Sequence, residues 1–256
     1  MTINIKGNEF YFDPMLARNL DCVKKDLKKD YDAWIIFDGM ERSGKSTFAA
    51  QCAYYIDNNI TLDRVCFTAS QFIEALRNAK PNQAIIFDEA FKYLASRRSM
   101  SLFNYLLISV MTEIGYKNLA VMICIPTFFE LDKYPAIHRS IALLHITNRG
   151  TFNGFSYAGK KLLYLWGKKG YNYAAARHDF HGTFTSFFPF NKEEYNAKKA
   201  KYAGVIDDLQ KEITKLKKGQ TEQTKAEVLA KLKEIEDVEK SKLDKQSEDS
   251  SDNQTI

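Results

Sequence analysis

The segment GMERSGKST at residues 39–47 contains the residue types that cradle a phosphate. Gly39 and Gly44, followed by Lys45 and Ser46, complete the pattern of a phosphate-binding loop. The glycines let the backbone turn tightly and direct its N–H groups at a phosphate. Lys45 supplies a mobile positive charge for the β- and γ-phosphates, and the Ser46 hydroxyl is a ligand for Mg²⁺. We therefore expect ATP and Mg²⁺ to bind here. The predicted nucleotide contacts are Gly39, Met40, Glu41, Arg42, Ser43, Gly44, Lys45, Ser46 and Thr47.

Two adjacent acids, Asp88 and Glu89, end the apolar run QAIIF at residues 83–87. An acid at the carboxyl end of a strand beside the phosphate-loop strand is suited to hold Mg²⁺ through water, and we predict this role for Asp88 together with Ser46. Glu89 is then placed to orient and deprotonate an attacking water. The pair favours ATP hydrolysis over phosphate transfer, because a nucleotide kinase needs no water-activating Glu at this point.

The elements that must position these residues follow from five short apolar runs. Each run is rich in Ile, Val, Phe and Leu and is mostly apolar on both faces, which is typical of parallel strands covered by helices on both sides. The segments between the runs are long enough for crossover helices, at 46–58, 70–79 and 100–115. We therefore predict an α/β fold over residues 1–148, a mostly parallel sheet between helices as in RecA-like P-loop NTPase cores. The runs are AWIIF (33–37), RVCFT (64–68), QAIIF (83–87), LAVMICI (119–125) and SIALLHI (140–146).

The run DEAFKYLASRRSMSLFNYLLISVMTEIGYKNLAVMICIPTFFELDKYPAIHRSIALLHI resembles motor ATPases of the HerA/FtsK type, and the resemblance covers roughly residues 30–150. These additional-strand P-loop ATPases pump or transfer DNA and include viral genome-packaging ATPases and conjugative coupling proteins. The resemblance implies an ATP-driven translocase of double-stranded DNA that works as a homo-oligomeric ring, typically a hexamer. It favours viral genome packaging in the host cytoplasm, with a capsid or portal component as a partner, over conjugative transfer.

The same resemblance implies two further kinds of site residue. A polar residue at the tip of the strand next to the acid-bearing strand senses the γ-phosphate, and Thr127 has that place. The family often has Gln there, so Pro126-Thr127 departs from its pattern. An arginine that neutralises transition-state charge is worth about 10³–10⁵ in rate. The candidates for it are Arg42, Arg97, Arg98, Arg139 and Arg149, of which Arg149 and Arg98 rank highest.

Two other functions remain open on the sequence. The loop GMERSGKST also looks like that of thymidylate kinases, but that resemblance covers only about 15 residues and neither a D-R-Y-like substrate motif nor an Arg-rich lid follows. The second alternative is a P-loop assembly or morphogenesis protein of the Zot type. DNA-stimulated ATP hydrolysis distinguishes the motor from both.

The net charge of +5 has a local origin, because residues 149–190 contain six basic residues and a single acid, Asp179. Glycines and aromatic residues punctuate this segment, and we predict a β-rich module of hairpins or meandering loops that includes KKLLYLW at 160–166. Basic side chains without acidic neighbours suit the DNA backbone. The predicted contacts to double-stranded DNA are Lys160, Lys161, Lys168 and Lys169.

Residues 191–245 are predicted to be a helical tail, because Asn191 and Glu194 have the spacing of a helix N-cap. The polar residues 246–256 are predicted to be disordered. No run of 18 apolar residues or secretory signal is present, and the cysteines read as buried free thiols, so we expect a cytoplasmic protein without a membrane span. Three lysines of the tail could extend the DNA surface, namely Lys198, Lys199 and Lys201.

Overall fold

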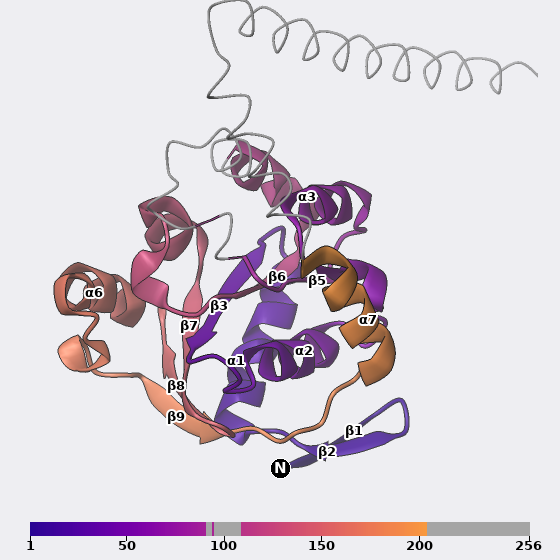
Figure 1. Cartoon of the computed structure of the whole chain (residues 1–256), viewed down its shortest axis with the longest axis horizontal. Coiled ribbons are helices and arrows are strands. Elements are labelled where there is room, and N and C mark those ends of the chain that lie inside the picture. Colours follow the sequence, from indigo (N-terminus) through magenta and orange to yellow (C-terminus); the bar gives the residue numbers. More distant parts are fainter. Residues whose placement is uncertain (91–93, 95–108, 204–256) are drawn as a thin grey trace, which may run out of the picture. The chain divides into compact units, whose positions relative to one another are not determined.

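The computed structural model describes residues 1–90, 94 and 109–203, and the first 203 residues form one compact unit. In this part of the chain a two-stranded hairpin precedes a seven-stranded sheet with helices on both of its faces (Figure 1). The elements are β1 (Thr2–Ile5), β2 (Asn8–Tyr11), α1 (Pro14–Leu27), β3 (Ala33–Gly39), α2 (Lys45–Ile56), β4 (Val65–Cys66), α3 (Ala69–Asn78), β5 (Ala84–Phe87), β6 (Ala120–Cys124), β7 (Ala142–Asn148), β8 (Thr151–Phe155), α6 (Tyr157–Gly167), β9 (Phe180–Thr183) and α7 (Lys192–Ala203).

The sheet has the strand order β4-β5-β6-β3-β7-β8-β9. The first five strands in this order run parallel, and β8 and β9 continue the sheet as antiparallel strands. All five predicted apolar runs are therefore strands, and the prediction of a mostly parallel α/β sheet is confirmed. One detail differs from expectation. The strand that ends in Asp88 does not pair with β3, because β6 lies between β5 and β3.

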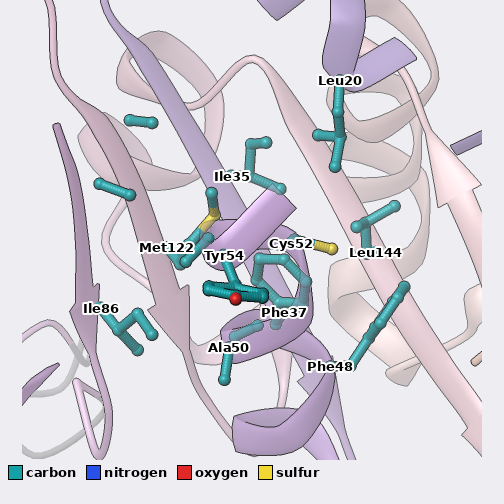
Figure 2. Packing of buried hydrophobic residues seen from close by; sticks show 14 of the residues in the cluster. Leu20, Ile35, Phe37, Phe48, Ala50, Cys52, Tyr54, Ile86, Met122 and Leu144 are labelled. Carbon is teal, nitrogen blue, oxygen red and sulfur yellow. The ribbon is translucent and has the colours of Figure 1, made fainter. Parts of the chain in front are cut away.

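Each face of the sheet has its own apolar core, because successive strand residues point to opposite sides. On one face, Ile35, Phe37 and Met122 pack with α1 and α2, and Figure 2 shows part of this cluster. On the other face, Trp34 and Ile36 belong to a cluster with buried residues of α3 and α6. The sheet is thus the middle layer of three, and its parallel strands bring their carboxyl ends to one edge.

Helix α1 and the β1–β2 hairpin were not among the predicted elements, although the start of α1 has a clear local signal. The Asp13 carboxylate accepts hydrogen bonds from the N–H groups of Met15 (2.9 Å) and Leu16 (3.0 Å), and Pro14 occupies the first helical turn. Both features stabilise a helix N-terminus. The buried side of the helix consists of Leu16, Ala17, Leu20, Val23 and Leu27.

The prediction for residues 149–190 was right for two strands and wrong for the segment between them. Residues 160–166 are part of α6, not of a hairpin. Its N-cap residue Ser156 accepts a hydrogen bond from the N–H of Gly159, and Leu163 and Tyr164 are buried. Strands β8 and β9 pair with each other and extend the sheet beyond β7. The basic segment is therefore continuous with the sheet of the core.

Helix α7 begins where the predicted helical tail begins, and the Asn191 side chain accepts from the N–H of Glu193 (2.9 Å) and of Glu194 (3.3 Å). The rest of the predicted tail and the predicted disordered end lie outside the described residues. All four cysteines are free, and Cys22 is exposed, contrary to expectation. Within the ranges given above, no helix combines the length and apolar character needed to cross a membrane.

Candidate functional site

The chain between β3 and α2 forms the tight loop that its glycines predict. Gly39 has φ +142°, and a Cβ added to it would lie 2.6 Å from the carbonyl oxygen of Ile146. Gly44 has φ +101° and is the N-cap of α2, and a Cβ there would lie 3.2 Å from the ring of Phe184. Both positions therefore favour glycine for their conformation, and Gly39 also requires it for space. The helix N-terminus that follows favours an anionic ligand.

Lys45 folds back over this loop. Its ammonium donates hydrogen bonds to the carbonyl oxygens of Gly39 (2.9 Å) and Met40 (2.6 Å). Burial lowers the pKa of Lys45, and the charge of nearby Asp88 offsets part of that effect. The Ser43 hydroxyl is buried and finds no hydrogen-bond partner among the described residues. A lysine held at the mouth of such a loop and an unsatisfied hydroxyl both fit a phosphate ligand.

Ser46 and Asp88 are in direct contact. The Ser46 hydroxyl lies 3.0 Å and 3.1 Å from the two carboxylate oxygens of Asp88, which is buried at the end of β5. Glu89 follows in the left-handed backbone region with φ +62°, which is uncommon for a residue with a side chain. A hydroxyl and a carboxylate side by side are oxygen donors of the kind that Mg²⁺ prefers. The residues present therefore fit a bound Mg²⁺.

Two side chains of α7 reach the same acids. The Tyr195 hydroxyl donates a hydrogen bond to Asp88, and burial together with that carboxylate raises the pKa of Tyr195. The Lys199 ammonium lies 3.2 Å from a carboxylate oxygen of Asp88 and 3.0 Å from one of Glu89. Burial alone would lower the pKa of Lys199, but the two carboxylates outweigh it and the pKa is raised. Helix α7 thus forms part of the site.

The neighbouring Lys198 also points inward. Its ammonium donates to the carbonyl oxygens of Leu62 (2.6 Å) and Val65 (2.9 Å), and its side chain is half-buried. The prediction that the lysines at 198 and 199 extend a DNA surface is therefore wrong. Both ammonium groups bind to the protein itself.

A pocket of about 840 Å³ lies over the loop and is bounded by the acids and by α7. Five cationic residues and three acids line it, a balance that suits a polyphosphate carrying a divalent cation. Of the nine predicted nucleotide contacts, Gly39, Met40 and Ser43 do not line it. The lining residues are Glu41, Arg42, Gly44, Lys45, Ser46, Thr47, Asp88, Glu89, Cys124, Ile125, Pro126, Arg149, Phe188, Lys192, Tyr195, Asn196 and Lys199.

Thr127, the predicted γ-phosphate sensor, is not among the residues that line this pocket. Its hydroxyl lies 3.2 Å from the hydroxyl of Tyr173, which donates to the buried carboxylate of Asp38. Asp38 also lies 2.9 Å from Nδ1 of His145, whose ring stacks on Tyr173 at 3.7 Å between centroids. Burial and the charge of Asp38 raise the pKa of Tyr173. Thr127 therefore belongs to a group of hydrogen-bonded side chains that includes Tyr173 and Asp38. Asp38 directly precedes the predicted phosphate loop in the sequence.

The candidate arginines differ in position. Arg42 and Arg149 are exposed and line the pocket, and Arg42 has a left-handed backbone with φ +59°. Arg139 is a structural residue, because its guanidinium pairs with Asp32 and lies 4.5 Å over the ring of Trp34. It does not line the pocket. Arg97 and Arg98 lie outside the described residues.

The predicted DNA contacts also separate into two groups. Lys160 is fully buried, and its ammonium donates to the carbonyl oxygens of Ala136 (2.8 Å) and Ile137 (3.0 Å). Burial lowers the pKa of Lys160 to about 8. It cannot contact DNA, so this part of the prediction is wrong. The lysines of the set that reach the surface are Lys161 and Lys169, which are exposed, and Lys168, which is half-buried.

Sequence reasoning missed the roles of Tyr195 and Lys199 in the site. The two residues are four positions apart and share a helix face, but this spacing does not indicate what that face contacts. Sequence reasoning also missed the pair of Asp38 and His145, which are direct partners in the register of β3 and β7. No family model matches the chain, and no curated protein shows significant similarity to it.

Proposed function

We propose that the chain is an ATP-hydrolysing motor that translocates or packages double-stranded DNA. The observation that carries the hydrolytic part is the contact of the Ser46 hydroxyl with both carboxylate oxygens of Asp88, on a pocket that Lys45 and Glu89 also line. A phosphate loop, a metal-binding oxygen pair and a carboxylate base on one pocket are the parts that hydrolysis of a nucleoside triphosphate requires.

In this proposal each side chain has one task. Lys45 moves from the loop carbonyls to the β- and γ-phosphates, and Ser46 and Asp88 hold the metal ion. Bound Mg²⁺ neutralises charge that develops on the phosphate oxygens. Glu89 accepts a proton from the attacking water. Arg42 and Arg149 line the pocket and are the described arginines best placed to stabilise the transition state, within one chain or across a ring of subunits.

The strand order supports hydrolysis over phosphate transfer. In additional-strand ATPases one more strand separates the phosphate-loop strand from the strand that ends in the acid pair, and β6 has that place between β3 and β5. The acid pair itself supports the same choice, because a kinase transfers the phosphoryl group to its substrate and must exclude water.

Incubation with ATP and either dTMP or long duplex DNA tests the proposal. The motor releases phosphate faster when duplex DNA is present and forms no thymidine diphosphate. Formation of the diphosphate would favour the thymidylate-kinase alternative. Slow turnover that DNA does not change would favour a Zot-type assembly protein, and a chain that binds no ATP would contradict all three.

The DNA-contacting part of the proposal rests on the surface lysines of α6 and the turn after it. Lys161 and Lys169 are exposed, and no acid other than Asp179 occurs between residues 149 and 190. We propose that this side faces DNA in a homo-oligomeric ring, which is hexameric in the resembling motors, and that the ring docks on a viral capsid or portal component in the host cytoplasm. The mass of the assembly with and without Mg·ATP tests the ring.

A further inference from the structure

One carboxylate oxygen of Asp88 lies within hydrogen-bonding distance of three groups. The Ser46 hydroxyl lies 3.1 Å from it, the Lys199 ammonium lies 3.2 Å from it, and the Tyr195 hydroxyl donates to it. Lys199 also bridges to Glu89 at 3.0 Å. Two of these three groups come from α7, which Figure 1 shows in orange next to β5 and α2. Both acids of the proposed hydrolytic site are therefore engaged by one helix.

This arrangement competes with a divalent cation. Mg²⁺ takes six ligands at about 2.0–2.1 Å in near-ideal octahedral geometry and keeps several waters. An ammonium about 3 Å from the same carboxylate oxygen occupies the space of those waters and repels the metal ion. A carboxylate oxygen also has two lone pairs, and the Tyr195 hydroxyl and the Lys199 ammonium already use both. The Lys199 ammonium and hydrated Mg²⁺ therefore compete for the same space and the same lone pairs at Asp88.

Lys199 has a similar effect on Glu89. A general base must have a lone pair directed at the attacking water. The Lys199 ammonium lies 3.0 Å from a carboxylate oxygen of Glu89 and so occupies a position from which that oxygen would accept a proton of the water. The contacts of α7 therefore oppose both functions that the acid pair has in ATP hydrolysis.

We propose that α7 is a latch on the nucleotide site, in which Lys199 and Tyr195 hold the Asp88–Glu89 pair until Mg·ATP displaces them. The proposal rests on the proposed ATPase function and adds its regulation. Binding of the metal and departure of the ammonium from Asp88 are then one event. The latch therefore sets the Mg²⁺ concentration at which the nucleotide site binds Mg·ATP.

The segment before α7 gives the latch a fixed base. The side-chain amide of Gln51, which is buried in α2, donates to the carbonyl oxygens of Thr185 and Phe187, both at 2.7 Å. These two bonds hold the chain to the helix that begins at the phosphate loop. When Lys199 and Tyr195 are displaced, α7 therefore moves relative to Thr185 and Phe187, which stay attached to α2.

Replacement of single α7 side chains tests the latch. Lys199→Met removes the ammonium, and Tyr195→Phe removes only the hydroxyl and keeps the ring that packs on Phe67 and Phe188. The matched control is Lys201→Met on the same helix, since Lys201 is exposed and its ammonium lies 5.6 Å over the ring of Tyr202. In the absence of DNA, Mg²⁺ is titrated against binding of a fluorescent ATP analogue. Amide hydrogen exchange of residues 192–203 is followed without ligand, with Mg²⁺ alone, and with Mg²⁺ and the analogue.

The latch predicts a coherent set of changes. Lys199→Met lowers the half-saturating Mg²⁺ concentration about three- to tenfold, the effect of losing a partly exposed ion pair with two carboxylates. Tyr195→Phe shifts it in the same direction, and Lys201→Met leaves it unchanged. In the wild type, Mg²⁺ with the analogue speeds amide exchange in α7, and in Lys199→Met that exchange is already fast without ligand.

Other outcomes overturn the latch or the function separately. Weaker analogue binding by Lys199→Met at saturating Mg²⁺, with an unchanged metal dependence, would make Lys199 a phosphate contact and end the latch proposal. Slower α7 exchange on addition of Mg²⁺ and the analogue would do the same. If neither the wild type nor any variant binds the analogue, the proposed ATPase function is wrong. Amide exchange of residues 192–203 with Mg²⁺ alone still decides whether the metal displaces α7.

Discussion

The Ser46 hydroxyl lies within 3.1 Å of both carboxylate oxygens of Asp88, across a sequence separation of 42 residues. The contact joins the first turn of α2 to the end of β5, two strands away from β3 in the sheet. It makes the hydroxyl and the carboxylate one donor set, so that neither is expected to hold a metal ion independently of the other.

Ser46→Ala should therefore raise the Mg²⁺ concentration needed for half-maximal ATP binding at least about tenfold, because a methyl group supplies no ligand. A Mg²⁺ titration at fixed ATP measures the change. Ser70→Ala, on the exposed side of α3, is the control and should behave as the wild type. An unaltered metal dependence in Ser46→Ala would remove Ser46 from the metal site.

Glu89→Gln should keep ATP binding and lower the rate of phosphate release at least about 10²-fold, the usual contribution of a general base. The amide has nearly the shape of the carboxylate but cannot accept the proton. Nucleotide binding and single-turnover phosphate release separate the two effects. Glu9→Gln on exposed β2 is the charge-matched control. Turnover retained by Glu89→Gln would refute the proposed base.

Lys160 predicts a pH dependence of stability. Its pKa is about 8 in the folded chain, below the ordinary value of 10.5. Between these values the unfolded chain binds more protons than the folded one, so the free energy of unfolding rises with pH. The penalty is complete below pH 8 and disappears above about 10.5. Relative to Lys160→Met, the free energy of unfolding of the wild type should rise by about 2 kcal/mol between pH 7.5 and 9.5. Guanidinium chloride unfolding at both pH values measures this change. An equal pH dependence of the two chains would contradict the buried ammonium.

The exposed lysines around α6 predict an effect on DNA affinity. The double variant Lys161→Glu with Lys169→Glu should weaken binding of long duplex DNA. The slope of log affinity against log salt should become shallower by about 2, close to one unit for each lost phosphate contact. Lys25→Glu with Lys29→Glu makes the same change of charge on the exposed side near α1 and serves as the control. Equal losses in both double variants would show that only net charge matters.

Gly39→Ala should destabilise the chain by about 1–3 kcal/mol and abolish ATP binding. A side chain there adopts φ +142° with its Cβ 2.6 Å from a backbone oxygen. Gly170→Ala is the control, because a Cβ at that position meets nothing within 4 Å and its φ is not positive. Thermal unfolding and ATP binding of both variants measure the difference. A Gly39→Ala chain that binds ATP normally would contradict the geometry of the loop.

The parallel strands could be predicted because their composition carries the signal. Every residue of β3 and of β6 is buried, so the first five residues of β3 and all of β6 read as uninterrupted apolar runs. The same rule failed at α6, where Leu162 to Trp166 are also continuously apolar. Leu165 is 55% and Trp166 64% exposed, so apolar character did not report burial there. The N-cap residue Ser156 indicated the helix better than the apolar run indicated a strand.

The candidate site was predictable where its residues are adjacent in sequence or end a strand. The predicted phosphate loop is one segment, and Asp88 and Glu89 follow a strand directly. Lys199 comes from a helix that no local pattern connects to those acids, and its inward orientation depends on the path of the chain from β9 to α7. The pairing of Asp38 with His145 likewise depends on the register of two strands that are distant in sequence.

Asp88 meets Tyr195 across 107 residues and Lys199 across 111. During synthesis, the phosphate loop and both acids leave the ribosome before α7 has been translated. Contacts between such distant residues form late in folding, because closing a long loop costs chain entropy. The proposed nucleotide site therefore lacks the α7 contacts to Asp88 until late in folding, because α7 is the last described element to be synthesised.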